Sequence, residues 1–372
     1  MIRLAGRGLG ALALALGLLV VAALGLRAWL QHQTADTPAS HARNGIDEAR
    51  FVRIGGIDQW ITIRGEDRRN PVVLVLHGGP GVPMSYQIRA FQPMERRYVV
   101  VQWDQRGGGK TFSHGGGPPD PNLSMATMVN DGIALSEYLR GYLHRDGLII
   151  VGHSWGTVLG VKMAQARPDL YAAFVGTGQV AGSLTDRQRW FYAYLLKRAA
   201  AAGDTKGLAE LKTGAGPPPW TEDSPQILHM AHAAVPYLPP HLVHERNVFT
   251  ALTTPHWSLS DVRSVGRSQR DVLNSALGRE AGSTDFSRLD GAFAIPVMII
   301  QGENDEATPT VFARQWYGRV HAPAKAFVVI PAQGHSVLLT DNAGFTRALD
   351  ANLRPLLAAR RRADAQSNEG PR

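Results

Sequence analysis

A serine flanked by glycines gives the clearest indication of chemistry in this sequence. Gly152-His153-Ser154-Trp155-Gly156 follows the apolar run Leu148 to Val151 and precedes a segment with helical periodicity. Glycines at the two flanking positions let a strand and a helix crowd together, and the serine between them is exposed at the carboxyl edge of a sheet. The pattern predicts a nucleophile elbow with Ser154 as the nucleophile, although a glycine-rich turn after a strand can also be plain structure.

A second glycine-rich loop, His77-Gly78-Gly79-Pro80-Gly81, follows the apolar run Pro71 to Leu76. Acyl transfer places negative charge on the carbonyl oxygen in its transition state, so a hydrolase needs hydrogen-bond donors aimed at that oxygen. The backbone amides near Gly79 and at Trp155 are the predicted donors of this oxyanion hole. The loop could also be a simple turn, but its place after a strand favours the catalytic interpretation.

A serine nucleophile needs a histidine base and a carboxylate that orients the base, in the chain order serine, acid, histidine. Candidates for both follow Ser154 in that order. His335 lies just past the strand-like run Ala326 to Ile330, and the acids lie just past the run Pro296 to Gln301. The competing acids are Glu303, Asp305 and Glu306. Spacing favours Asp305 only weakly, because any of the three could be a solvated loop charge.

Four motifs spread along the chain belong together. They are His77-Gly78-Gly79-Pro80-Gly81; Asp104-Gln105-Arg106-Gly107-Gly108-Gly109-Lys110; Gly152-His153-Ser154-Trp155-Gly156-Thr157; and Asp305 with Thr308-Pro309 ahead of Gly334-His335-Ser336. With them the sequence resembles the proline iminopeptidase branch of the α/β-hydrolases, from roughly Phe51 to Leu357 and only weakly between Gly178 and Asp290. The resemblance implies that Ser154 is the nucleophile, His335 the base and Asp305 the acid that orients it.

The resemblance also implies a reaction: a serine hydrolase with an acyl-enzyme intermediate, and specifically an aminopeptidase that releases N-terminal residues from small peptides. In proline iminopeptidases, acidic cap residues bind the free amino group and accompany a Trp-Glu element for which no counterpart is recognisable here. A buried ammonium needs a carboxylate partner. The acids that could substitute, none of them assignable, are Glu210, Glu222, Asp223 and Glu245. The alternatives are an esterase or amidase for a non-peptide acyl substrate and a non-catalytic binding module.

Several polar residues near these motifs are expected to be structural. Asp104 and Arg106 follow the strand-like run Tyr98 to Gln102, where such residues more often hold a loop by a charge-assisted hydrogen bond than take part in chemistry. His77 and His153 are expected to pack rather than react.

The elements that must position these loops predict an α/β-hydrolase fold, with a mostly parallel central sheet flanked by helices and an inserted helical cap. Phe51 to Ile54 and Gln59 to Arg64 predict two antiparallel edge strands. Apolar runs without alternation predict buried parallel strands at Pro71–Leu76, Tyr98–Gln102, Leu148–Val151, Tyr171–Val175, Pro296–Gln301 and Ala326–Ile330. Helix-period segments lie between them, including Met125 to Leu143 after Ser124 as N-cap.

The predicted domain organisation has six parts. They are a membrane anchor or signal segment (1–30), a polar linker (31–50), the first part of the hydrolase core (51–178), the helical cap (179–290), the second part of the core (291–357) and a disordered tail (358–372). Aromatic residues of the cap such as Trp190 and Tyr194 are expected to pack within it. Two histidine pairs at i, i+3 spacing, His229 with His232 and His241 with His244, suggest a metal site only weakly, and neither a metal nor a cofactor is predicted.

The amino terminus predicts a membrane-spanning helix. Leu9 to Leu26 is an uncharged apolar run preceded by Arg3 and Arg7, and it is long enough to cross a bilayer. The core of a signal peptide is normally shorter, about 7 to 15 residues. We expect an uncleaved anchor with the catalytic domain outside the cytoplasm. The alternative is a cleaved signal that releases a secreted or periplasmic protein.

Composition limits the partners. The 372 residues include 39 basic and 31 acidic side chains, a net charge of +8 that is spread out except for Arg360 to Arg362. Without a basic face or interleaved aromatic residues, nucleic-acid binding is not expected. The absence of cysteine excludes disulfides, a thiol nucleophile and a lipoprotein anchor. The expected partners are a small peptide or other small acyl substrate and the membrane, and the oligomeric state is left open.

Overall fold

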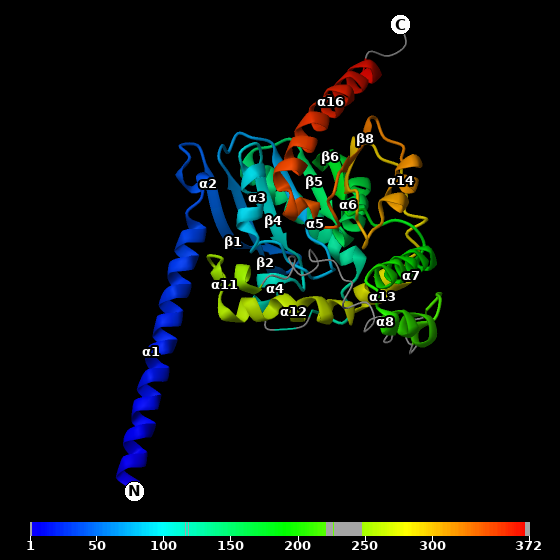
Figure 1. Ribbon diagram of the computed structural model, residues 1–372. Coiled ribbons are helices and arrows are strands. Elements are labelled where there is room, and N and C mark those ends of the chain that lie inside the picture. Colours follow the sequence, from blue (N-terminus) through cyan, green and yellow to red (C-terminus); the bar gives the residue numbers. More distant parts are fainter. Residues whose placement is uncertain (1, 116, 118, 221–225, 227–247, 369–372) are drawn as a thin grey trace.

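The computed structural model describes residues 2–115, 117, 119–220, 226 and 248–368. Its centre is an eight-stranded sheet in the order β1-β2-β4-β3-β5-β6-β7-β8, in which β2 pairs antiparallel with both β1 and β4, and β3 to β8 run parallel (Figure 1). The strands are β1 (Ile46–Ile54), β2 (Ile57–Gly65), β3 (Val72–Leu76), β4 (Val99–Asp104), β5 (Leu148–His153), β6 (Tyr171–Thr177), β7 (Val297–Gly302) and β8 (Lys325–Ile330). This confirms the predicted sheet and its two antiparallel strands, of which β1 lies at the edge and β2 next to it.

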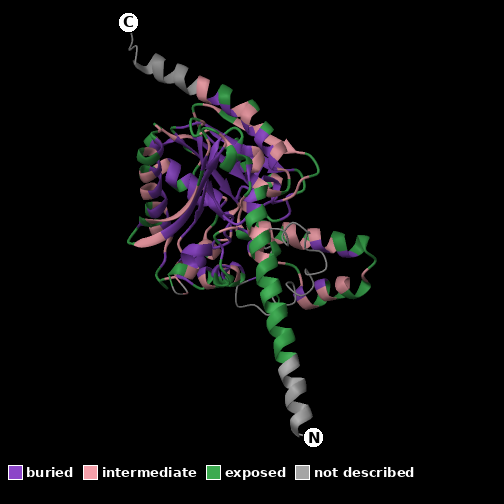
Figure 2. Ribbon diagram, turned by 90° about the vertical axis from the view of Figure 1, so that its left-hand side faces the viewer, coloured by how far each residue is buried: buried purple, intermediate pink, exposed green. Residues whose placement is uncertain are grey.

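Helices cover both faces of the sheet. On β3, Leu74 belongs to the core under α5 (Met125–Leu143) and α6 (Trp155–Ala166), while its neighbour Val75 belongs to the core under α3 (Ile88–Glu95) and α16 (Asn342–Asn368). Successive side chains of a strand point to opposite faces, so an apolar run without alternation supplies both cores. Figure 2 shows the resulting buried centre of the molecule. Ser124 caps α5 as predicted, because its hydroxyl accepts the amide of Thr127.

Shorter helices occupy the connections. They are α2 (Pro38–His41), α4 (Gly109–His114), η1 (Pro168–Leu170), α14 (Thr310–Gly318) and α15 (Val337–Thr340). Two segments differ from the sequence expectation. Residues 31–50, expected as a linker, include the end of α1 (Ile2–Ala35), all of α2 and the start of β1. The chain after Leu357, expected to be disordered, continues α16 as far as Asn368.

Between β6 and β7 the described chain is helical. Its elements are α7 (Leu184–Ala201), α8 (Thr205–Ala209), the π-helical turn η2 (Glu210–Ala215), α11 (Val248–Thr253), α12 (Leu259–Leu273) and α13 (Ala276–Ser283). In α7 the rings of Trp190 and Tyr194 stack at 5.6 Å, and Leu195 is buried in a small core of its own with Leu211. We refer to these helices as the cap.

Helix α1 projects from the body toward the end of the molecule where the cap lies, opposite α16 (Figure 1). Within its segment Leu12–Ala35, the most apolar stretch of 18 residues has a mean hydropathy of 2.1, and none of that stretch is buried against the rest of the protein. By length and composition this helix is able to cross a membrane, and a signal sequence shares both properties.

Candidate active site

Ser154 occupies the sharp turn between β5 and α6. Its backbone has a φ of 54° and a ψ of −125°, a conformation that is uncommon for a residue with a side chain. A Cβ on Gly156 would lie 2.2 Å from the carbonyl oxygen of Leu76, and a Cβ on Gly152 would lie 2.6 Å from the carbonyl oxygen of Gly156. Only glycine fits at these two positions, as expected for a nucleophile elbow.

Asp305 and His335 meet after the ends of β7 and β8. Nδ1 of His335 lies 3.0 and 3.1 Å from the two carboxylate oxygens of Asp305. Both residues are buried, with 3% and 2% of the histidine and the aspartate exposed. The carboxylate also accepts hydrogen bonds from Nε2 of Gln301 at 2.8 Å and from the amide and hydroxyl of Thr308 at 2.8 and 2.9 Å. These donors fix the orientation of the carboxylate, which in turn holds the imidazole.

The competing acid Glu303 has another contact. Its Oε2 accepts the backbone amide of Ala332 at 3.0 Å in the loop before His335, and the glutamate is exposed. Glu306 is buried, with 6% of its surface exposed. The carboxylate whose oxygens contact the imidazole is that of Asp305, the acid that the family resemblance selects.

The turn at Ser154 and the imidazole of His335 both lie next to Gly178. A Cβ built on Gly178, just past β6, would lie 2.8 Å from Cε1 of His335 and 3.4 Å from the backbone nitrogen of Ser154. The rings of His335 and His153 are 4.9 Å apart. Four parallel strands, β5 to β8, thus end where a hydroxyl, an imidazole and a carboxylate gather, which are the residue types of a nucleophile, a base and an orienting acid.

A cavity of about 520 Å³ opens at Ser154. Gly79 and Trp155 line it as well, so the loop after β3 and the first turn of α6 face the same space. First-turn amides of a helix have no acceptor within the helix and are available to an anion. The lining also includes Pro80, Val180, Leu184, Arg187, Leu273, Gly278, Arg279, Ala281, Gly282, Phe286, Ala307 and Thr308. The cavity therefore lies between the strand ends and the cap.

The two histidines near the motifs are buried. Nδ1 of His77 donates to the carbonyl oxygen of Gly78 at 2.9 Å, and its Nε2 accepts the amide of Gln105 at 3.2 Å. Burial lowers the pKa of His77 to about 4, so the ring is neutral and holds two loops together. His153 lies with its Nε2 3.2 Å from the carbonyl oxygen of His335.

Asp104 and Arg106 both hold loops, but not through one another. Nε of Arg106 donates to Oδ2 of Asp131 on α5 at 2.7 Å, and its Nη2 donates to the carbonyl oxygen of Gly55. Oδ2 of Asp104 accepts the amide of Lys110 at 2.8 Å. Burial raises the pKa of Asp104 to about 7.

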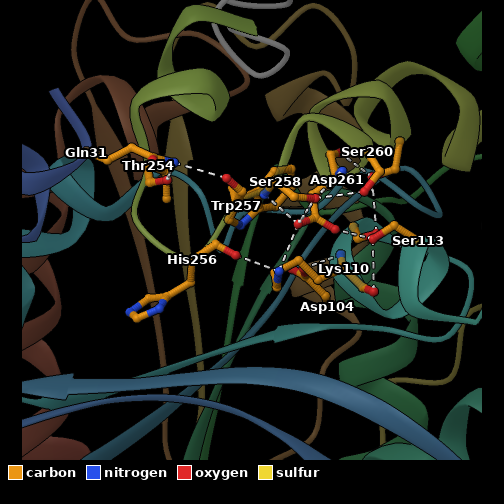
Figure 3. Close-up of polar contacts among 12 residues, drawn as sticks. Gln31, Asp104, Lys110, Ser113, Thr254, His256, Trp257, Ser258, Ser260 and Asp261 are labelled. Atoms are coloured by element: carbon orange, nitrogen blue, oxygen red, sulfur yellow. Dashed lines mark hydrogen bonds and ion pairs between the residues drawn. The ribbon is translucent and has the colours of Figure 1, made fainter. Parts of the chain in front are cut away.

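A charged pair joins the core to the cap. Figure 3 shows Nζ of Lys110, on α4, between Oδ2 of Asp261 at 2.8 Å and the carbonyl oxygen of His256 at 2.6 Å. Asp261 also accepts the amide of Ser258, whose hydroxyl accepts the amide of Asp261, and this capping box begins α12. The pair is largely buried, with 11% of the lysine side chain and 7% of the aspartate side chain exposed.

Further along α12, Ser268 contacts the loop after β3. Its hydroxyl donates to the carbonyl oxygen of Gly81 at 2.8 Å and is fully buried. A Cβ on Gly81 would lie 3.1 Å from the backbone of Gln269. The cap helix therefore supports the loop that carries Gly79.

Helix α1 is bound to the chain that leads into α12. Arg27 donates to the carbonyl oxygens of Leu252 and Trp257. Nε2 of Gln31 donates to those of Thr254 at 2.8 Å and Trp257 at 3.0 Å (Figure 3). These contacts lie at the end of the apolar stretch that is nearest the body.

Most of the cap residues considered above as metal or ammonium ligands lie outside the described residues. All four histidines of the two pairs lie there, as do Glu222, Asp223 and Glu245. Glu210 is described at the start of η2 and does not line the cavity at Ser154. Within the part of the chain that the structure describes, there is no group of three histidine, aspartate or glutamate side chains able to hold a metal ion.

Sequence reasoning missed Arg187, Asp261 and Ser268. The Ser258-x-x-Asp261 capping box indicates a helix start. Lys110, with which Asp261 pairs, lies 151 residues away in sequence, so no local pattern indicates the pair. Arg187 and Ser268 carry no local signal, because only packing of the cap brings them to the cavity and to the glycine loop.

Comparison with known proteins identifies relatives over most of this chain. Residues 72–348 match the Alpha/beta hydrolase family. The chain is 26% identical to a probable aminopeptidase of Bacillus subtilis, over 82% of this chain and 95% of the relative. It is also 26% identical to a putative carbamate hydrolase of Klebsiella pneumoniae, over 78% and 94%. Among solved structures, a proline iminopeptidase-related protein of Thermus thermophilus superposes with a TM-score of 0.57 and 19% identity, over 84% of this chain and 99% of that one.

Proposed function

The chain belongs to the alpha/beta hydrolase family, and from that membership we propose that it is a serine hydrolase acting through an acyl-enzyme intermediate. The observation that carries the proposal is the contact of His335 Nδ1 with both carboxylate oxygens of Asp305, beside the elbow that presents Ser154 to a cavity. No cofactor enters this chemistry.

The proposed mechanism follows from these positions. Because Nδ1 of His335 donates to Asp305, Nε2 is the nitrogen that takes the proton of Ser154 as the hydroxyl attacks the acyl carbon. Asp305 stabilises the imidazolium, and the amides near Gly79 and at Trp155 hold the oxyanion. The imidazolium then protonates the leaving group, and water activated by the same histidine releases the acyl group.

The first candidate substrate is a small peptide, from which the enzyme would release the N-terminal residue. The relative named as a probable aminopeptidase, aligned over 95% of its length, supports this candidate. An aminopeptidase must pair the substrate ammonium with a carboxylate. Among the described residues that line the cavity there is no aspartate or glutamate, so the described lining provides no such partner.

The second candidate is a non-peptide ester or amide. Two arginines, Arg187 and Arg279, line the cavity at Ser154 and would repel an ammonium group. The relative named as a putative carbamate hydrolase supports hydrolysis of a compound other than a peptide. Both candidates share the same acyl-transfer chemistry at Ser154.

Two measurements test the proposal. A fluorophosphonate probe should label the wild-type protein and fail to label Ser154→Ala, and a labelled Ser154→Ala variant would contradict the assignment. A panel of amino-acyl arylamides, including the prolyl one, and of short and long acyl nitrophenyl esters then separates the substrates. Activity on the esters alone would end the peptidase candidate.

We also propose that α1 is retained as a membrane anchor with the catalytic domain outside the cytoplasm. The hydrogen bonds of Arg27 and Gln31 to the chain before α12 support retention, because cleavage near Ser40 to Ala42 would remove both side chains. Fractionation with a carbonate wash tests this. The full-length protein should stay in the membrane pellet, and complete release of a shortened protein would refute the anchor.

A further inference from the structure

The cap side of the cavity at Ser154 carries positive charge on an otherwise apolar wall. Its charged members, among the described lining residues, are Arg187 on α7 and Arg279 on α13. The remaining cap residues of the wall are apolar or glycine: Leu184, Leu273, Gly278, Ala281, Gly282 and Phe286. A pocket with an apolar lining and one or two placed polar groups uses those groups to orient its ligand.

Arg187 places a partly buried guanidinium at this wall. Among the described residues, its guanidinium forms no ion pair, and its Nε is buried without a hydrogen-bond acceptor. The guanidinium of Arg187 lies over the ring of Phe286, with 5.2 Å between Cζ and the ring centroid. Burial lowers the pKa of Arg187 below its ordinary value. An ionised, partly desolvated group with an unsatisfied donor favours an anionic ligand.

The nearby acid does not fill this role. Asp285 attracts Arg187 through space, but its carboxylate pairs with Arg288 at 3.5 Å and accepts the amide of Ser287 at 2.9 Å. Arg279 is exposed and donates to the carbonyl oxygen of Asn274 at 3.2 Å. Arg187 is therefore the better placed of the two arginines to bind a ligand group, and Arg279 adds charge at the same wall.

We propose that the substrate of this hydrolase carries a carboxylate or phosphate group, which Arg187 binds on the cap side of the cavity while Ser154 attacks the acyl carbon. The inference rests on the proposed serine hydrolase function and narrows its substrate class to anionic esters or amides. A guanidinium donates two parallel hydrogen bonds to either anion. The ring of Phe286 lies beside the guanidinium and should reduce the entropy that Arg187 loses on binding.

Matched nitrophenyl esters test this with the full-length protein in detergent. Monoadipate and hexanoate esters have acyl chains of equal length that end in a carboxylate or a methyl group, and the 6-aminohexanoate ester ends in an ammonium. A carboxylated nitrophenyl leaving group on hexanoate places the anion on the other side of the scissile bond. We expect kcat/KM to be at least about tenfold higher for an ester with an anion on one side than for the neutral ester, which corresponds to about 1.4 kcal/mol.

Variants assign the preference to the residue. Arg187→Gln should bring the ratio of kcat/KM between anionic and neutral esters to about one, and Arg187→Lys should keep part of it. Arg189→Gln is the matched control, because Arg189 lies on the same helix, is exposed and lies 4.0 Å from Asp186. An anionic preference that persists in Arg187→Gln, or a wild-type preference for the neutral or ammonium ester, would overturn the inference.

A binding measurement separates this inference from the proposed catalysis. Calorimetry on Ser154→Ala compares hexanoate and hexyl phosphate with neutral hexanamide. Both anions should bind more tightly than the amide, and Arg187→Gln in the same background should remove the difference. Equal binding of the three would contradict anion recognition even if the esters are hydrolysed, whereas failure of probe labelling with intact anion binding would contradict only the catalytic proposal.

Discussion

Nζ of Lys110 in the core lies 2.8 Å from Oδ2 of Asp261 on the cap helix α12. Removing one member of a buried pair leaves the other charge uncompensated, which typically costs about 3 to 5 kcal/mol. We expect Lys110→Met and Asp261→Asn each to lower the free energy of unfolding by a few kcal/mol, measured by denaturant titration. The loss in the double variant should be smaller than the sum of the two single losses.

An exposed pair provides the control for this prediction. Arg167 on the surface lies 2.6 Å from Glu137, with 39% and 50% of the side chains exposed. Arg167→Gln should change stability by no more than about 1 kcal/mol. Equal losses in Lys110→Met and Arg167→Gln would mean that the pair between core and cap contributes no more than a surface ion pair.

Ser268 is expected to act as a positioning residue for the oxyanion loop, because its buried hydroxyl donates to the carbonyl oxygen of Gly81. Ser268→Ala should lower kcat by roughly tenfold with little change in KM, since small displacements of transition-state donors reduce rate rather than binding. Ser268→Thr should restore most of the rate. The control is Ser260→Ala on the same helix, where the hydroxyl is exposed. A parallel change in KM and kcat, or no rescue, would indicate a merely structural role.

Replacing Asp305 or Glu303 by its amide compares two of the three candidate acids through their effect on kcat. Asp305→Asn removes the charge that orients His335 and should lower kcat by up to ~10⁴-fold, as expected when the acid of a triad becomes an amide. Glu303→Gln, the matched change, affects a side chain that accepts the amide of Ala332 and should leave kcat within a few-fold of wild type. Similar losses in both variants would contradict the assigned roles, provided that circular dichroism shows both to be folded.

Asp104 predicts a pH dependence of stability. Burial raises its pKa from the usual 3.8 to about 7 in the folded state. The folded protein therefore binds this proton more tightly than the unfolded chain, so the stabilisation is present at low pH and is lost as the pH rises through about 7. Asp104→Asn, which keeps an acceptor for the amide of Lys110, removes this loss.

We expect the melting temperature of Asp104→Asn relative to wild type to increase between pH 5 and pH 8, measured by differential scanning fluorimetry. A pKa difference of one between the folded and unfolded states corresponds to about 1.4 kcal/mol, so the change in stability should be a few kcal/mol at most. A difference in melting temperature that stays constant over this range would contradict the raised pKa.

Arg27 and Gln31 should couple α1 to the cap. Replacing both by alanine removes four hydrogen bonds to backbone carbonyls, each worth about 1 kcal/mol or somewhat more for the charged donor. We expect faster cleavage by trypsin between α1 and β1 in the detergent-solubilised full-length protein. The exposed His32 provides the control, and His32→Ala should behave as wild type. Equal cleavage of all three proteins would contradict the coupling.

Much of the fold was readable from local sequence. The six predicted parallel strands and the meander all lie within or next to observed strands, and α5 spans the predicted residues after Ser124. Buried parallel strands produce continuous apolar runs, and an N-cap serine interacts with amides a few residues away, so both signals are local. The glycines beside Ser154 were readable for the same reason, because the turn itself requires them.

Other features depended on distant packing. The order of residues predicted an acid before His335. The packing of the loops after β7 and β8 decides that the imidazole of His335 contacts Asp305, while Glu303 accepts the amide of Ala332. The cap contacts of Lys110, Arg187 and Ser268 have no local pattern, because their partners lie about 100 or more residues away in sequence and meet them only after the sheet has placed the cap. Local propensities thus determined the elements and the turn that carries Ser154, the proposed nucleophile. Only the tertiary structure decided which side chains surround that turn, since ion pairing and desolvation depend on distance in space rather than along the chain.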